Sequence, residues 1–109
     1  MDILTASSRL EALGNPTRLA IYRALVRAGG AGAPVGRLQE LIGIPASTLS
    51  HHLAKLCGCG LVAQTREGTV LRCRANYPVM NELVGYLVDE CCADAKAEPV
   101  SACGDAGCA

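Results

Sequence analysis

Apolar residues recur every three or four positions along most of this chain. That spacing places them on one face of a helix. It predicts helices over residues 3–13, 16–28, 35–42, most of 44–61, and from 77 to about 96. Between residues 62 and 75 the apolar positions alternate instead, which is typical of strands. We therefore expect a mainly α-helical protein with one β-hairpin.

Residues 44–61 combine a helical pattern with a distinctive polar face. Pro45 suits the first turn of a helix, and Gly58 and Gly60 end it. Three leucines share one face of this helix: Leu49, Leu53 and Leu56. The opposite face carries side chains that donate hydrogen bonds, namely Ser47, Ser50, His51 and Lys55. Such a face suits the major groove of DNA, and an ordinary solvated surface helix is the alternative.

The segments on either side of this helix match those of a winged helix-turn-helix. A short helix over residues 35–42 and a turn at Gly43 precede it. Two short strands joined at Glu67 and Gly68 follow it. Basic side chains lie along these strands: Arg66, Arg72 and Arg74. A basic hairpin in this place is typical of a wing that contacts DNA, and a plain solvated hairpin is the alternative.

The composition favours a small dimeric domain. A chain of 109 residues forms one domain, and this one contains no Phe or Trp and only three Tyr. Its core is therefore built from Leu, Val, Ile and Ala, and a small domain of this kind often gains stability by dimerising. Apolar residues also cover about half of the circumference of the last expected helix, more than one packing surface needs. We expect two subunits to share this helix.

Charge is distributed unevenly along the chain. Residues 1–76 carry nine Lys or Arg and four Asp or Glu, whereas residues 77–109 carry one and six. A basic body can approach phosphate groups while an acidic end faces elsewhere. The sequence contains no secretion signal and no apolar run long enough to cross a membrane, so we expect a cytoplasmic protein.

Seven cysteines in a cytoplasmic chain favour metal binding or redox chemistry over a disulfide framework. Four of them lie near the end of the chain: Cys91, Cys92, Cys103 and Cys108. Neighbouring helical residues point about 100° apart, so we expect Cys91 on the apolar side of the last helix and Cys92 on its polar side. A disulfide between them would be strained. We expect a folded domain over residues 1–96 and a flexible tail over 97–109 that can add a third sulfur ligand for a soft ion.

The order of these elements and four motifs resemble the ArsR/SmtB family of winged helix-turn-helix repressors, which respond to metals and metalloids. The motifs are LGNPTRLAIYRAL (residues 13–25), STLSHHLAKL (47–56), GLV (60–62) and REG (66–68). The resemblance implies five helices, a two-stranded wing, and a homodimer held by the first and last helices. It also implies that the dimer binds operator DNA in the absence of inducer. The expected DNA contacts are Ser47, Thr48, Ser50, His51 and Lys55 on the recognition helix, with Arg66 and Arg72 on the wing.

Two metal sites that are common in this family are missing from the sequence. The helix before the recognition helix has no Cys-x-Cys motif, and the last helix has no His. One subgroup of the family senses metalloid through a vicinal cysteine pair and a downstream cysteine, a pattern that Cys91, Cys92 and Cys103 match. The resemblance therefore implies trivalent arsenic or antimony as the inducer, with Cys108 as an alternative third ligand.

Other functions are compatible with the same residues. The late cysteines could form a thiol redox switch on the same repressor fold, or Cys91 could simply pack in the dimer interface. A soft-metal buffering or delivery protein without a DNA role is a further alternative. Packing roles are favoured for His52 and for three cysteines that could otherwise form a second thiolate site: Cys57, Cys59 and Cys73. An enzyme is not expected, because no phosphate-binding loop and no cysteine–base pair occurs at recognisable spacing.

Overall fold

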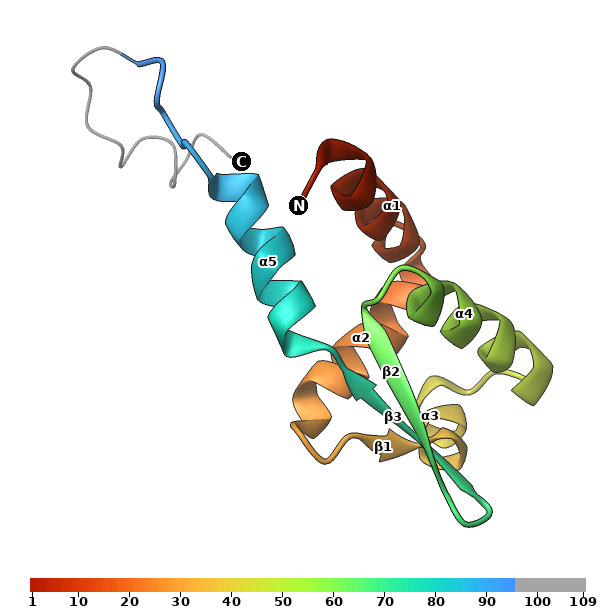
Figure 1. Cartoon of the computed structure of the whole chain (residues 1–109). Coiled ribbons are helices and arrows are strands. Elements are labelled where there is room, and N and C mark those ends of the chain that lie inside the picture. The colour runs from red at the N-terminus through yellow and green to blue at the C-terminus, as the bar shows by residue number, and fades with distance from the viewer. Residues whose placement is uncertain (96–109) are drawn as a thin grey trace.

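The computed structural model describes residues 1–95 and has the expected winged helix-turn-helix architecture (Figure 1). Its elements are α1 (Ile3–Leu13), α2 (Pro16–Ala28), β1 (Ala33–Pro34), α3 (Val35–Ile42), α4 (Ala46–Gly58), β2 (Val62–Glu67), β3 (Val70–Ala75) and α5 (Tyr77–Val88). The five helices and the hairpin confirm the predicted fold class. In Figure 1, α1 and α5 lie at one end of the molecule, and the β2–β3 hairpin projects from the other end. Within residues 1–95, no helix has the length and apolar character that crossing a membrane requires.

Capping side chains explain where two of the helices begin. Asn15 accepts a hydrogen bond from the backbone N–H of Arg18 at 3.0 Å, and Pro16 occupies the first turn of α2. Asn76 accepts in the same way from the N–H of Val79 at 3.3 Å at the start of α5. Each cap satisfies an N–H group that has no partner within the helix, so local sequence is sufficient to set these boundaries.

The turn between α3 and α4 depends on a glycine. Gly43 has a φ of +75°, in the left-handed region that other residues rarely adopt, and its N–H donates to the carbonyl of Gln39 at 2.8 Å. Pro45 then lies at the N-cap of α4, one position before the first helical turn that we expected it to occupy. The predicted inner face of α4 is confirmed, because Leu49, Leu53 and Leu56 are fully or almost fully buried.

The sheet contains a strand that the sequence pattern did not predict. Its order is β1-β3-β2, with all neighbours antiparallel, so the wing hairpin gains a third strand instead of forming a two-stranded sheet. Ala33 of β1 pairs with Cys73 of β3, and it lies in the glycine-rich segment between the predicted helices 16–28 and 35–42, where the sequence pattern indicates a flexible connector. Gly32 precedes this strand with a φ of +69°, and a Cβ there would overlap the carbonyl oxygen of Cys73. A two-residue strand has no detectable period, and it forms only because the edge of β3 lies beside it.

The core lies between the inner faces of α2, α3 and α4 and the base of the sheet. The largest fully buried side chains are Ile21, Leu25, Leu38, Leu49, Leu53, Leu56, Leu61 and Cys73. On α1 the helical spacing of Ile3 and Leu10 predicts that both are buried, and this prediction is wrong for the single chain. They are 69% and 41% exposed, whereas Ala6 and Ala12 are buried. The small residues let α1 approach the core closely and leave its larger aliphatic side chains on the surface.

The last helix is shorter than predicted. It ends at Val88 instead of near Lys96, so Cys91 and Cys92 do not end a helix and the expected helical spacing between them does not apply. No glycine or proline marks this end. Leu87 and Val88 in the last turn of α5 are 57% and 60% exposed, so this end of the helix has little tertiary packing to stabilise a further turn.

Candidate DNA interface and thiol pair

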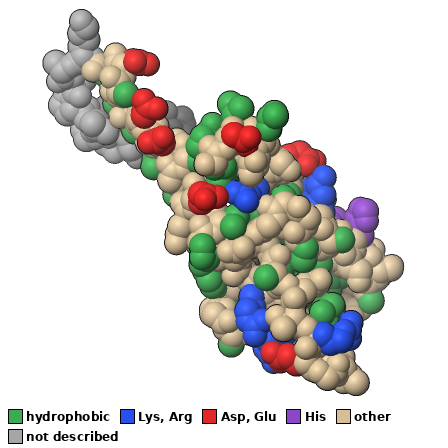
Figure 2. All heavy atoms as spheres, in the orientation of Figure 1, with side chains coloured by type: hydrophobic (Ala, Val, Ile, Leu, Met, Phe, Trp, Pro, Cys, Tyr) green, Lys and Arg blue, Asp and Glu red, His purple; other side chains and the backbone are tan. Residues whose placement is uncertain are grey.

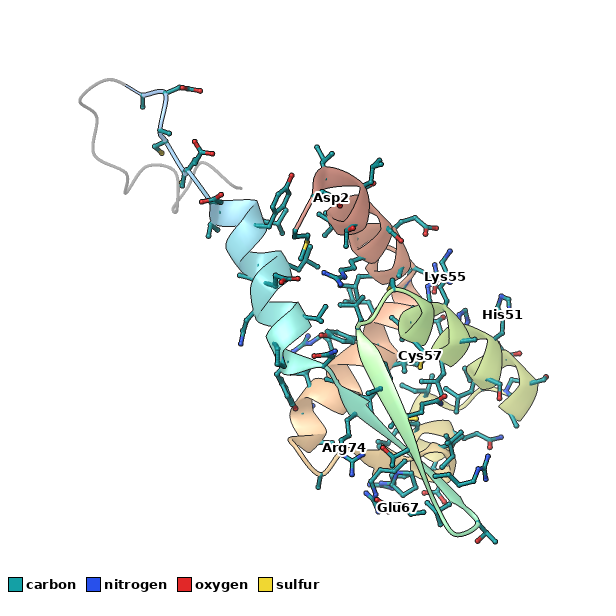
Figure 3. All side chains as sticks on the ribbon, viewed as in Figure 1. Asp2, His51, Lys55, Cys57, Glu67 and Arg74 are labelled. Carbon is teal, nitrogen blue, oxygen red and sulfur yellow. The ribbon has the colours of Figure 1, made fainter. Side chains whose placement is uncertain are left out.

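The outer face of α4 presents the side chains that we predicted would contact DNA. Ser47, Thr48, Ser50 and His51 are all exposed. Figure 3 shows His51 and Lys55 projecting from α4 on the side away from the sheet. The buried leucines on the opposite face hold the helix against the core, so its polar face is available to a major groove. His52, on the same helix, is half-buried, and burial, followed by the charges of Arg18 and His51, lowers the pKa of its imidazole.

Lys55 already has a partner in the protein. Its Nζ lies 3.1 Å from Oε1 of Glu11 on α1, and both side chains are about half exposed or more, at 46% and 62%. An ion pair this exposed contributes at most about 1 kcal/mol. Lys55 can therefore exchange Glu11 for a DNA phosphate at small cost.

The wing arginines lie on opposite faces of the hairpin. Arg66 pairs across the strands with Leu71, and Arg72 pairs with Thr65. Since opposite residues of a ladder share a face, Arg66 lies on the face of the sheet that also carries the buried Cys73. Within residues 1–95 the Arg66 guanidinium forms no hydrogen bond or ion pair with another side chain.

Arg72 and Arg74 fasten the wing to the rest of the domain. Arg72 donates from Nε to Oε1 of Glu67 at 2.9 Å and from Nη1 to the carbonyl of Ala31 at 3.2 Å. Arg74 donates to the carbonyl of Gly30 at 3.2 Å and to Oγ1 of Thr65 at 2.7 Å. The hydrogen bond from Arg72, together with the charges of Arg72 and Arg74, lowers the pKa of the Glu67 carboxyl. Of the two wing residues predicted to contact DNA, Arg66 is the more available and Arg72 is engaged in holding the wing.

The surface follows the charge division seen in the sequence. In the view of Figure 2, acidic side chains gather over the upper part of the molecule, around α5 and the chain that follows it. Two groups of Lys and Arg side chains flank a single acidic region at the lower end, where the sheet lies, and histidine lies at the right-hand edge. The end that carries the wing is therefore better suited to a polyanion than the end that carries α5.

Cys91 and Cys92 lie in the first two of three consecutive turns that directly follow α5. The Cys91 N–H donates to the carbonyl of Val88 at 3.0 Å, and the Ala93 N–H donates to that of Glu90 at 2.9 Å. The third residues of these turns, Glu90 and Cys92, have φ values of 59° and 60°. Type II turns require a positive φ at that position and usually place glycine there. Holding two other residues in this conformation costs about 1–3 kcal/mol each.

These turns bring the two sulfur atoms together. The Sγ atoms of Cys91 and Cys92 lie 3.7 Å apart, well beyond the roughly 2.05 Å of a disulfide bond. Cys91 is exposed and Cys92 is half-buried. Within residues 1–95 no group of three or more His, Cys, Asp or Glu side chains is arranged to hold a metal ion. The predicted third ligand, Cys103, and its alternative, Cys108, lie outside the described residues.

The other three cysteines are packed within the domain. Cys73 is fully buried and its sulfur accepts a hydrogen bond from Nε2 of Gln64 at 3.4 Å. Burial raises the pKa of the Cys73 and Cys57 thiols, which disfavours the thiolate form that binds metals. The Cys59 thiol donates to the carbonyl of Leu56 at 3.5 Å. These surroundings agree with packing roles for the three residues.

The sequence pattern does not single out Arg9, whose importance is apparent only from its contacts. Arg9 of α1 lies between the end of α4 and the middle of α5 and bonds to both. One arginine in an amphipathic helix carries no sequence signal that distinguishes it from a solvated charge. Its partners become visible only when the three helices are packed together.

Comparisons with known proteins agree with this architecture. Residues 13–65 match a family described as a helix-turn-helix domain. The nodulation protein NolR of Rhizobium meliloti is 33% identical over 88 residues, which cover 81% of this chain and 70% of NolR. Among solved structures, an ArsR-like transcriptional regulator from Rhodococcus sp. RHA1 is 25% identical with a TM-score of 0.70, over 84% of this chain and 82% of that one.

A second solved structure is the homodimeric winged helix-turn-helix DNA-binding domain of a possible ArsR-family regulator from Mycobacterium bovis. It is 26% identical with a TM-score of 0.64, over 87% of this chain and 88% of that one. The two solved structures are named as ArsR-type transcriptional regulators, in agreement with the polar recognition helix and the basic wing of this chain. This chain belongs to the ArsR family of winged helix-turn-helix transcriptional regulators.

Proposed function

We propose that this regulator is a homodimeric repressor that releases operator DNA when trivalent arsenic or antimony binds Cys91, Cys92 and a tail cysteine, Cys103 or Cys108. The observation that carries the proposal is the pair of sulfur atoms 3.7 Å apart directly after α5. An ion about 2.3 Å from each sulfur, the length of a zinc–thiolate bond, can touch both atoms at this separation. The pair is therefore a ready chelate for one soft ion.

The donor chemistry favours a thiophilic element. A site built from sulfur alone suits soft ions and not magnesium or calcium, which take oxygen ligands. Each sulfur that binds replaces one hydroxyl of arsenous acid and releases a water molecule, so no redox partner is needed. The strained turn at Cys92 supports a functional role, because strain of this kind is concentrated at ligand-binding sites.

A dimer through α1 and α5 would cover the exposed apolar surface of these helices. The side chains concerned are Ile3, Leu4, Val84, Leu87 and Val88, which are 55–77% exposed in the single chain. Exposed apolar side chains on two neighbouring helices favour an interaction surface. The relative from Mycobacterium bovis is homodimeric, which supports a two-subunit assembly. Two recognition helices in such a dimer would read half-sites one helical turn, about 34 Å, apart.

The thiol pair is well placed to influence this dimer, because its turns continue directly from α5. Metalloid binding that ties the tail to these turns would alter the packing of α5 against its neighbours and disfavour the DNA-competent spacing. A coupling free energy of about 1–3 kcal/mol per site corresponds to roughly 5- to 150-fold weaker operator binding.

Titration of the protein with arsenite and antimonite on fluorescently labelled operator DNA tests the proposal. We expect the operator affinity to fall roughly 5- to 150-fold as metalloid is added. Calcium and magnesium at the same concentrations serve as controls and should have no effect. Release by peroxide that dithiothreitol reverses, with no response to metalloid, would contradict the proposal and indicate a thiol redox sensor.

The wing geometry gives a separate prediction about DNA binding. Replacing Arg66 with Ala should weaken operator binding and reduce the slope of log affinity against log salt by about one unit, as expected for one lost phosphate contact. Arg72→Ala is the matched comparison and should change this slope much less, because Glu67 and the Ala31 carbonyl hold its guanidinium. Anisotropy titrations at several salt concentrations measure both slopes. Equal slope changes for the two variants would contradict this division of roles.

A further inference from the structure

One arginine links three helices of the described chain. Arg9 lies on α1, and its Nε donates a hydrogen bond to the backbone carbonyl of Cys59 at 3.0 Å. Its Nη1 donates to Oε1 of Glu82 on α5 at 3.1 Å and forms an ion pair with it. The Arg9 side chain is only 14% exposed, against 55% for Glu82. The planar guanidinium holds both partners at once, which the single nitrogen of a lysine does not readily reproduce.

The Cys59 carbonyl marks the junction between the recognition helix and the wing. Cys59 is the C-cap residue of α4, and β2 begins at Val62. Between them, Gly60 has a φ of +83°, and a Cβ there would lie 3.5 Å from Nη2 of Arg9, so the guanidinium packs against this turn. A cation that donates to a carbonyl at a helix C-terminus is also favoured by the helix dipole. Arg9 therefore helps to set how the end of α4 lies against α1.

Glu82 connects the same arginine to the helix that leads to the thiol pair. It lies in α5, whose last residue, Val88, immediately precedes the turns that carry the thiols. A displacement of α5 relative to α1 would change the Arg9–Glu82 contact directly. A second link between α1 and α4, the ion pair of Glu11 with Lys55, does not involve α5. Removing each ion pair in turn therefore separates a contact that connects α1 to α5 from one that connects α1 only to α4.

We propose that Arg9 is a positioning residue that couples α5 to the recognition helix. The inference rests on the proposed function, since the signal that Arg9 would carry is inducer binding at the end of α5. With Glu82 in place, the guanidinium is held against the Cys59 carbonyl, and α4 and the wing keep their DNA-binding orientation. When α5 shifts, Glu82 moves away from Arg9, and the end of α4 loses the contact that fixed it.

The variant Glu82→Ala tests this coupling, with Glu11→Ala as its matched control, because each removes an exposed carboxylate paired with a cation. Because Glu82→Ala lacks this contact from the start, we expect it to bind the operator more weakly than the wild type without arsenite, and its further arsenite-driven loss of affinity to fall from roughly 5- to 150-fold to about twofold or less. Glu11→Ala should keep the wild-type response. Arg9→Lys should behave like Glu82→Ala, since an ammonium does not span both partners. Operator anisotropy and the absorbance of arsenic–thiolate bonds measure DNA release and metalloid binding separately.

Hydrogen exchange adds a measurement that requires no metalloid. Operator binding should slow amide exchange over residues 88–92 in the wild type and leave it unchanged in Glu82→Ala. An unaltered arsenite response in Glu82→Ala, or equal protection in both proteins, would overturn the role of Arg9. A wild type that ignores arsenite but still transmits protection to residues 88–92 would overturn the inducer assignment and leave the role of Arg9 standing.

Discussion

A protein carrying Cys91→Ser and Cys92→Ser is expected to bind operator DNA as the wild type does and to remain bound when arsenite is added. The two sulfurs lie 3.7 Å apart and act together as a chelate in the proposed site. Serine hydroxyls are hard donors and do not replace thiolates for a soft ion. Since a linked second ligand raises affinity by about 10²- to 10⁴-fold, we expect the arsenite affinity to fall by at least about 100-fold.

Cys59→Ser is a suitable control for this experiment. Cys59 is half-buried and its thiol donates to the carbonyl of Leu56, a bond that a serine hydroxyl can also make. This variant should release operator in arsenite as the wild type does. Anisotropy of labelled operator with increasing arsenite measures all three proteins. Release of the Cys91→Ser/Cys92→Ser protein at wild-type arsenite concentrations would exclude the pair as the sensor.

The second large effect concerns the dimer. Leu87→Glu should yield a folded monomer whose operator affinity is about 10²- to 10⁴-fold weaker, because a monomer engages one half-site instead of two. Leu87 is 57% exposed in the single chain and belongs, with Val84 and Val88, to an exposed apolar stripe about 100° wide on α5. A glutamate is well hydrated there in a monomer, whereas a dimer interface would bury its charge without a partner. The stability of the monomer fold should change by only about 0.5 kcal/mol, as for other surface substitutions.

Leu41→Glu gives a matched control for the change in oligomeric state. Leu41 is 54% exposed but lies on α3, away from α1 and α5. Light scattering should report a mass near 11.3 kDa for Leu87→Glu and twice that mass for both the wild type and Leu41→Glu. Circular dichroism should show the same helix content in all three. A Leu87→Glu protein that remains dimeric would place the interface elsewhere.

The recognition helix shows what sequence patterns predict well. The spacing of Leu49, Leu53 and Leu56 gave both the buried face of α4 and, by exclusion, its polar outer face. The helical period predicts which side chains are buried because a helix at the surface of a domain packs one face against the core. The caps at Asn15 and Asn76 likewise act within a few residues, so the starts of α2 and α5 follow from local chemistry alone.

The end of α5 shows where such patterns fail. No glycine or proline occurs between Val88 and Lys96, and these residues are compatible with a helix, so the sequence suggested eight more helical residues. Helix length there depends on whether another turn buries apolar surface. The actual turns replace a helical arrangement of Cys91 and Cys92 with one that brings their sulfurs to 3.7 Å. The thiol pair was therefore identified from sequence, but its geometry was not.

The sequence by itself determined the order and type of the main elements, the inner face of the recognition helix and the identity of the vicinal thiols. These follow from periodicity, caps and residue chemistry, which act over short distances along the chain. Only the tertiary structure decided that β1 joins the sheet, that Arg72 holds the wing while Arg66 remains available, and that Arg9 bridges α4 and α5. The partners of a long charged side chain depend on which elements meet in space, and contacts such as that between Arg9 and Glu82 join residues far apart along the chain.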